Sequence, residues 1–144
     1  MPEHPNAALI RRGYEAFSRG DLESLVPIFD ADAVWHVPEG TPFSGDHEGR
    51  EAVLAMLRGL IEQTDGTFEA KVSDVSAHGQ HAVAITRLRG AFDGKEMEAA
   101  GVAVYHISEG RIREVWSLRP EVRTSHELAS AAAAAARARA VRSR

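Results

Sequence analysis

Cysteine is absent from this sequence of 144 residues. Its absence excludes disulfide bonds, thiolate nucleophiles, iron–sulfur clusters and cysteine-based zinc sites. No apolar run approaches the roughly 18 residues that a membrane-spanning helix needs. The segment from Met1 to Asn6 also lacks the charged and apolar regions of a signal peptide. We therefore expect a cytoplasmic protein with no membrane contact, whose chemistry depends on oxygen and nitrogen groups.

Glycine-rich phosphate loops and clusters of metal ligands are lacking as well, so we expect no cofactor and no metal. The formal net charge is −4. Four arginines against one glutamate give residues 124–144 a charge of +3, which leaves −7 on residues 1–123. Because phosphate backbones attract basic surfaces, this acidic body is not expected to bind nucleic acid.

Helical spacing of apolar residues dominates the first half of the chain. A cap at Asn6 and a stop at Gly20 bound an amphipathic first helix. The spacing continues over residues 21–29, but Pro27 lies beyond the first turn, so the second helix is expected to be short or bent. A broad apolar stripe over residues 50–63 predicts a third helix that is buried over much of its girth.

Strand patterns dominate the second half, where Asp93-Gly94 is a preferred pair for a two-residue hairpin turn. The predicted strands are Thr67–Ala77, His81–Phe92, Lys95–Ile107 and Arg111–Leu118. A break in alternation at Ser73-Asp74 predicts a bulge, which would bend the sheet. Residues 33–37 predict one more short strand, and residues 39–49 a long loop. The whole pattern is that of an α+β domain.

Residues 124–144 differ in composition from the rest of the chain. They open with a capping box at Thr124 and continue into six consecutive alanines and an alternation of arginine and alanine. We predict an Ala/Arg-rich tail helix after a domain of residues 1–123. The tail has little apolar surface, so we expect it to be solvated; docking on a partner is the alternative.

Four motifs occur in an order that is typical of one fold. They are Tyr14-Glu15-Ala16-Phe17 with Gly20-Asp21-Leu22, the run from Phe29 to Pro38, Gly45-x-x-x-Gly49-Arg50, and Gly110 to Trp116. Over residues 6 to about 120 the chain resembles SnoaL-like, ketosteroid isomerase-related members of the NTF2-like superfamily. The resemblance implies a cone of three N-terminal helices packed on a strongly curved, mainly antiparallel sheet around an apolar pocket, and a homodimer.

The same alignment bears on activity. Gly13 stands where ketosteroid isomerases have the oxyanion tyrosine, Val37 where they have the general base, and Ala103 where they have the second acid. A base must accept a proton and an oxyanion donor must hold one, which these side chains cannot do. The resemblance therefore implies that ketosteroid isomerase activity is absent.

Strand alternation and helix spacing also predict which side chains line the pocket. The expected ligand-binding residues are Tyr14, Phe17, Trp35, Val37, Met56, Leu60, Thr86, Leu88, Tyr105 and Ser117. Their few hydroxyl and N–H groups suit orienting a carbonyl or a phenol. We therefore expect a small apolar ligand.

Histidines are the other candidates for catalytic or metal-binding residues. His36 adjoins the pocket strand and is the candidate general base if the strand phase is off by one residue; otherwise it points outward. His78 and His81 have H-x-x-H spacing, but the turn between them does not align metal ligands as a helix would. We therefore predict no metal site there.

Trp116 alternates with inward residues and is expected on the outer sheet face, where a homodimer would cover it.

Two function classes stay open. One is an isomerase, cyclase, dehydratase or hydrolase acting on an apolar oxygenated compound; the other is a non-catalytic ligand-binding or scaffold domain. An inward titratable side chain would favour the enzyme.

Overall fold

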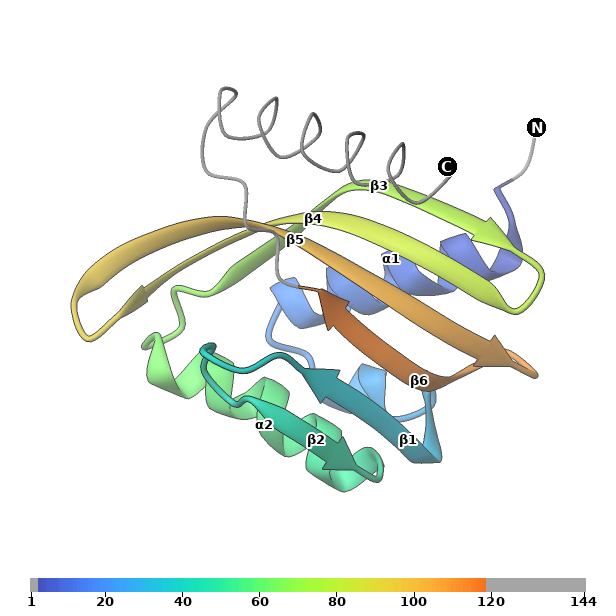
Figure 1. Ribbon diagram of the computed structural model, residues 1–144, viewed down its shortest axis with the longest axis horizontal. Coiled ribbons are helices and arrows are strands. Elements are labelled where there is room, and N and C mark those ends of the chain that lie inside the picture. Colours follow the sequence, from blue (N-terminus) through green and yellow to red (C-terminus); the bar gives the residue numbers. More distant parts are fainter. Residues whose placement is uncertain (1–2, 119–144) are drawn as a thin grey trace, which may run out of the picture.

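The computed structural model describes residues 3–118 (Figure 1). Within this range the chain forms two α-helices, one short 3-10 turn and six strands. They are α1 (Pro5–Ser18), η1 (Glu23–Leu25), β1 (Phe29–Val37), β2 (Gly45–Glu48), α2 (Arg50–Gln63), β3 (Glu69–His78), β4 (His81–Phe92), β5 (Lys95–Ser108) and β6 (Arg111–Leu118). The predicted domain boundary at residue 123 and the predicted tail helix at 124–144 lie outside the described residues.

Helix α1 begins two residues earlier than the predicted cap at Asn6 indicates. Its cap is His4, whose Nδ1 accepts a hydrogen bond of 3.1 Å from the backbone N–H of Asn6. Pro5 fits the first helical position because no partner for its missing N–H is needed there. The buried face includes Ile10 and Phe17, and the chain leaves the helix through Gly20 at φ 71°.

The expected second helix is only the 3-10 turn η1, so the expectation of three N-terminal helices is not confirmed. Asp21 closes this turn by accepting hydrogen bonds from the Ser24 backbone N–H at 3.2 Å and from its hydroxyl at 2.6 Å. Pro27 follows immediately and cannot donate to a helical ladder. The hydrogen bonds to Asp21 and the missing N–H of Pro27 thus end the helix that the apolar spacing alone predicts.

The six strands form one sheet in the order β2-β1-β6-β5-β4-β3. All neighbours are antiparallel except β1 and β6, which are parallel. The register of β3 on β4 shifts between Val72 and Asp74, which confirms the predicted bulge. Strand β2 lies inside the segment expected to be a loop; it is a short edge strand of largely polar, exposed residues.

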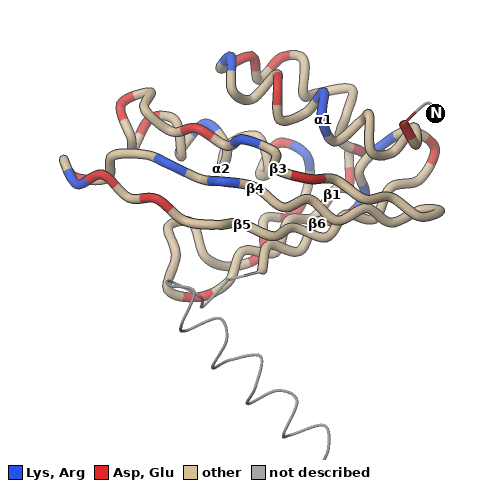
Figure 2. Tube along the Cα trace, turned by 90° about the horizontal axis from the view of Figure 1, so that it is seen from above, with Lys and Arg blue, Asp and Glu red and all other residues tan. Residues whose placement is uncertain are grey.

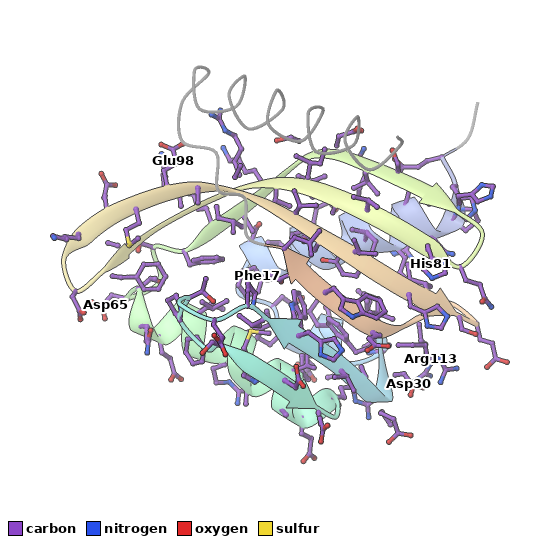
Figure 3. The ribbon with its side chains drawn as sticks, in the orientation of Figure 1. Phe17, Asp30, Asp65, His81, Glu98 and Arg113 are labelled. Carbon is purple, nitrogen blue, oxygen red and sulfur yellow. The ribbon has the colours of Figure 1, made fainter. Side chains whose placement is uncertain are left out.

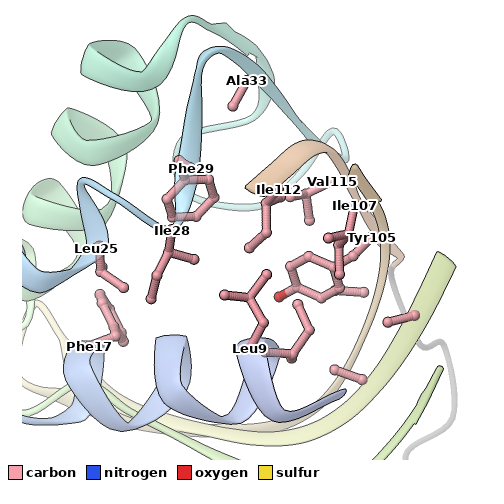
Figure 4. Close-up of a cluster of buried hydrophobic side chains, with 14 of the residues drawn as sticks. Leu9, Phe17, Leu25, Ile28, Phe29, Ala33, Tyr105, Ile107, Ile112 and Val115 are labelled. Carbon is pink, nitrogen blue, oxygen red and sulfur yellow. The ribbon is translucent and has the colours of Figure 1, made fainter. Parts of the chain in front are cut away.

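The sheet curves around a core that the two helices close from the same side (Figure 1). Helix α1 packs on β3 and β4, and α2 packs on β1 and β2. Figure 4 shows the side chains of Leu9, Phe17 and Tyr105 pointing into the space between α1 and the curved strands. Neither helix within residues 3–118 is long and apolar enough to cross a membrane.

Candidate functional site

Two tyrosine hydroxyls meet in the interior of the cone. Helix spacing directs Tyr14 of α1 against the core, and strand alternation directs Tyr105 of β5 inward. Figure 4 shows the Tyr105 side chain in the interior. Their hydroxyl oxygens are 2.6 Å apart and their rings pack edge to face. Burial raises the pKa of both phenols, although the hydrogen bond to Tyr105 partly offsets the effect at Tyr14. Both hydroxyls therefore stay protonated at neutral pH.

Trp35 of β1 packs beside this pair. Its ring is edge to face with the ring of Tyr105, with centroids 6.2 Å apart. Its indole N–H donates a hydrogen bond of 2.8 Å to the Ser117 Oγ on β6. Because Ser117 accepts this bond, its own hydroxyl proton remains available to another acceptor.

The other residues expected around the pocket come from four elements. Thr86 is buried and Leu88 partly buried on β4, and both lie across Gly101 of β5: a Cβ at Gly101 would come within 2.5 Å of the Thr86 Oγ1. Val37 on β1 and Leu60 on α2 are partly buried. Met56 on α2 is buried.

Phe17 of α1 lies in the interior near the centre of the molecule (Figure 3). Its ring packs edge to face on Phe68. Nine of the ten residues expected to bind a ligand are thus buried or packed against the buried core. The tenth, Ser117, is linked to the core through its hydrogen bond with Trp35.

The interior is apolar. Among residues 3–118 the buried residues with a polar side-chain group are Tyr105, Thr64 and Thr86, and no buried side-chain nitrogen or oxygen lacks a hydrogen-bond partner. No carboxylate, histidine or lysine of the described chain is buried. The arrangement can donate hydrogen bonds to an oxygen, but it offers no group suited to removing a proton from carbon.

His36 lies on the other side of the sheet. Its Nδ1 is 2.7 Å from Asp46 on β2 and its Nε2 is 2.5 Å from Glu114 on β6, and its ring stacks on Trp116. The hydrogen bonds to Glu114 and then Asp46 raise the pKa of His36. Of the two orientations considered for His36, inward as a general base or outward, the structure has the outward one. The ring therefore lies away from the tyrosines.

Two hollows flank α1 on the described surface. One, of about 390 Å³, lies between α1 and β3 and has the side chains of Tyr14, Ser18 and Lys71 in its wall. The other, of about 450 Å³, lies between α1 and the segment around Pro27. Tyr14 therefore lies between the first hollow and Tyr105.

The sequence analysis missed the contacts that give these residues their chemistry. Tyr14 and Tyr105 are 91 positions apart, and alternation could place both inward without showing that their hydroxyls meet. The partners of His36 were missed for a different reason. Asp46 lies on β2, whose polar sequence predicts a loop, and the parallel pairing of β1 with β6 that brings Glu114 alongside leaves no local signal in the sequence.

Comparison with known proteins agrees with this fold. Residues 10–115 match the SnoaL-like domain. An uncharacterised protein of Mycobacterium tuberculosis is 32% identical over 114 residues, which are 78% of this chain and 86% of that protein. The structure of Bal32a, from a soil-derived mobile gene cassette, has a TM-score of 0.76 at 33% identity and covers 79% of this chain and 88% of its own.

IdmH from Streptomyces antibioticus, a candidate polyketide cyclase, has a TM-score of 0.69 at 25% identity over 88% of this chain and 99% of its own. The fold, the order of its motifs and these matches agree. The chain belongs to the family of SnoaL-like domains.

Proposed function

We propose that this chain binds a small, largely apolar, oxygenated molecule and holds a carbonyl or phenol oxygen of that molecule against the Tyr14–Tyr105 pair. The observation that carries this proposal is the pair of hydroxyls, 2.6 Å apart, in an interior that is otherwise apolar. Two hydroxyls have two protons, and the bond between them uses one. The other is free for an oxygen of the ligand.

The remaining groups around the pair support the same role. The Ser117 hydroxyl, fixed by Trp35, supplies a further donor. The flat faces of Trp35 and Tyr105 suit a planar or polycyclic body. Such a site orients a ligand and polarises its oxygen without transferring a proton.

A cyclase acting on a polyketide-like compound is the second candidate. The similarity to IdmH favours it. Hydrogen bonds from Tyr14 or Tyr105 would stabilise the negative charge that develops on a carbonyl oxygen during ring closure, while the substrate itself supplies the nucleophile. His36 is left out of this proposal because it is engaged by two carboxylates on the outer sheet face.

We also propose a homodimer through the outer sheet face. Val83 and Ile85 of β4 are 38% and 44% exposed there. Val104 and Trp116 adjoin them across the strands. In Figure 2 the charged residues of β4 and β5 gather toward the turn that joins these strands, which leaves the other half uncharged. A second copy would remove this apolar surface from water.

Tryptophan fluorescence tests the ligand site. In a Trp116→Phe protein, Trp35 is the remaining tryptophan. We expect 1-tetralone, a bicyclic ketone, to quench its emission and to bind several-fold more tightly than tetralin, which lacks the oxygen, because one hydrogen bond contributes about 1 kcal/mol. Tyr14→Phe or Tyr105→Phe should remove that preference.

The control is Trp35→Phe, in which the ligand should leave the Trp116 signal nearly unchanged. Equal affinity for the ketone and the hydrocarbon, or a preference that survives both tyrosine substitutions, would contradict the proposed role of the hydroxyls.

A further inference from the structure

Three histidines lie side by side across the outer face of the sheet, at the end where β3 turns into β4. His81 is paired with His78 on β3 and with His106 on β5. Figure 3 shows the His81 side chain at this end of β4. The rings of His81 and His106 are stacked with their centroids 5.3 Å apart. We call these three residues the histidine row.

The histidine row has no other partner within residues 3–118. None of its rings forms a hydrogen bond or an ion pair with a described residue. By contrast, His4, His36 and His47 are each bound to a neighbouring atom of the chain. Both ring nitrogens of every member of the row are therefore free of partners within residues 3–118, and the row lies at the end of the outer face, two residues beyond the Val83–Val104 pair of the proposed dimer surface.

We propose that the histidine row binds a divalent transition metal ion of the class that prefers imidazole, such as Zn²⁺, Ni²⁺ or Cu²⁺. His81 and His106 would be the principal ligands and His78 the third. Glu114 pairs in register with His106, but its carboxylate is bound to His36 and is not counted among the ligands. This site is separate from the proposed ligand site, which lies on the opposite face of the sheet.

The strand pairing brings the rings close enough to share an ion. Two imidazole rings on one tetrahedral zinc ion, with nitrogen about 2.0–2.1 Å from the metal, have centroids about 5 Å apart. The rings of His81 and His106 are 5.3 Å apart, but they are stacked at an interplanar angle of 21°, and stacked rings must turn before their nitrogens can meet at one ion. In the present conformations no three ligating groups of residues 3–118 converge on one point. Rotation of the exposed rings of His78 and His81 is therefore required.

The register of β3 on β4 shows that the two histidines of the H-x-x-H spacing face each other across a hairpin. His78 and His81 flank a turn, so they do not share a helix face. A hairpin turn, however, places its flanking residues opposite each other. The third histidine comes from β5, which the spacing cannot show.

The test is calorimetric titration of the metal-free, full-length protein with Ni²⁺ and with Zn²⁺. We expect one ion per chain, and a loss of affinity of at least about tenfold in His81→Gln and in His106→Gln. The matched control is His47→Gln, because His47 lies on β2 and is bound to the Phe43 carbonyl; this variant should bind as the parent does. Circular dichroism verifies that each variant is folded.

Electron paramagnetic resonance of the Cu²⁺-loaded parent gives a second readout that needs no variant. Nitrogen hyperfine coupling from at least two imidazoles is the expected signal. Absence of binding by the parent, unchanged affinity in His81→Gln, or a loss that appears only in His47→Gln would overturn the proposal.

Discussion

Both ring nitrogens of His36 face carboxylates, which favours the protonated, positively charged form of the ring. Ionised Asp46 and Glu114 can only accept hydrogen bonds, so both ring nitrogens must donate. The raised pKa of His36 has the same cause. The protonated ring ties β2, β1 and β6 together at a point where the sheet switches from antiparallel to parallel pairing.

This charge predicts a pH dependence of stability. A folded-state pKa above the ordinary value of 6.5 gives stability that is fully present below that value and is lost as the pH rises through the raised pKa. The melting temperature of the parent should therefore exceed that of His36→Gln at about pH 6, and the difference should shrink by about pH 9. Glu114→Gln removes the stronger partner and should show a weaker dependence. A difference that grows with pH would contradict this assignment.

The tyrosine pair predicts an interaction energy. Tyr14→Phe or Tyr105→Phe leaves one buried hydroxyl without its partner, which should cost about 1–3 kcal/mol in the free energy of unfolding. The double variant removes both hydroxyls and should cost less than the sum of the two. Chemical denaturation of the four proteins measures the cycle. Additive costs would show that the two hydroxyls do not interact.

Among the elements, sequence pattern succeeded where burial dictates periodicity. The helix predicted at residues 50–63 is α2, and the four meander strands lie within two residues of their predicted ends, because half-buried elements need one apolar face. Apolar periodicity failed as a guide for the elements that are not held in place by burial. The η1 turn depends on a local hydrogen bond that the Ser24 N–H donates to Asp21, and β2 is an exposed edge strand held by pairing alone. Contacts between distant strands, such as those that assemble the tyrosine pair, have no periodic signal.

The loop before β2 rests on α2 through one close contact. Phe43, at φ 62°, packs against Gly59, where an added Cβ would come within 2.5 Å of the phenyl ring. Alanine is favoured over glycine in a helix by about 1 kcal/mol, but here its methyl group would displace Phe43. We therefore expect Gly59→Ala to be more stabilising in a Phe43→Ala background than in the parent. Thermal melts of the four proteins decide this, and equal effects in both backgrounds would show that the ring does not press on the helix.

At the scale of the whole molecule, the curved sheet has two unlike faces. The inner face is covered by α1 and α2, and it holds the tyrosine pair (Figure 1). The outer face has no covering layer within residues 3–118, yet β4 presents Val83 and Ile85 there. Apolar side chains on both faces of a sheet are expected when both faces are buried, since a strand with one solvated face alternates with polar residues.

The proposed homodimer therefore predicts that a charge on the outer face separates the subunits. Ile85→Glu and Trp116→Glu would each place two carboxylates in the interface, one from each copy, without access to water. Light scattering should give twice the chain mass for the parent and the single chain mass for these variants. Met97→Glu is the matched control, because Met97 is 58% exposed near the turn between β4 and β5 and its alternation places it on the other face. Trp116 also stacks on His36, so Ile85→Glu separates loss of the interface from loss of that contact. A monomeric parent, or an unchanged mass in Ile85→Glu, would show that a second copy does not cover this face.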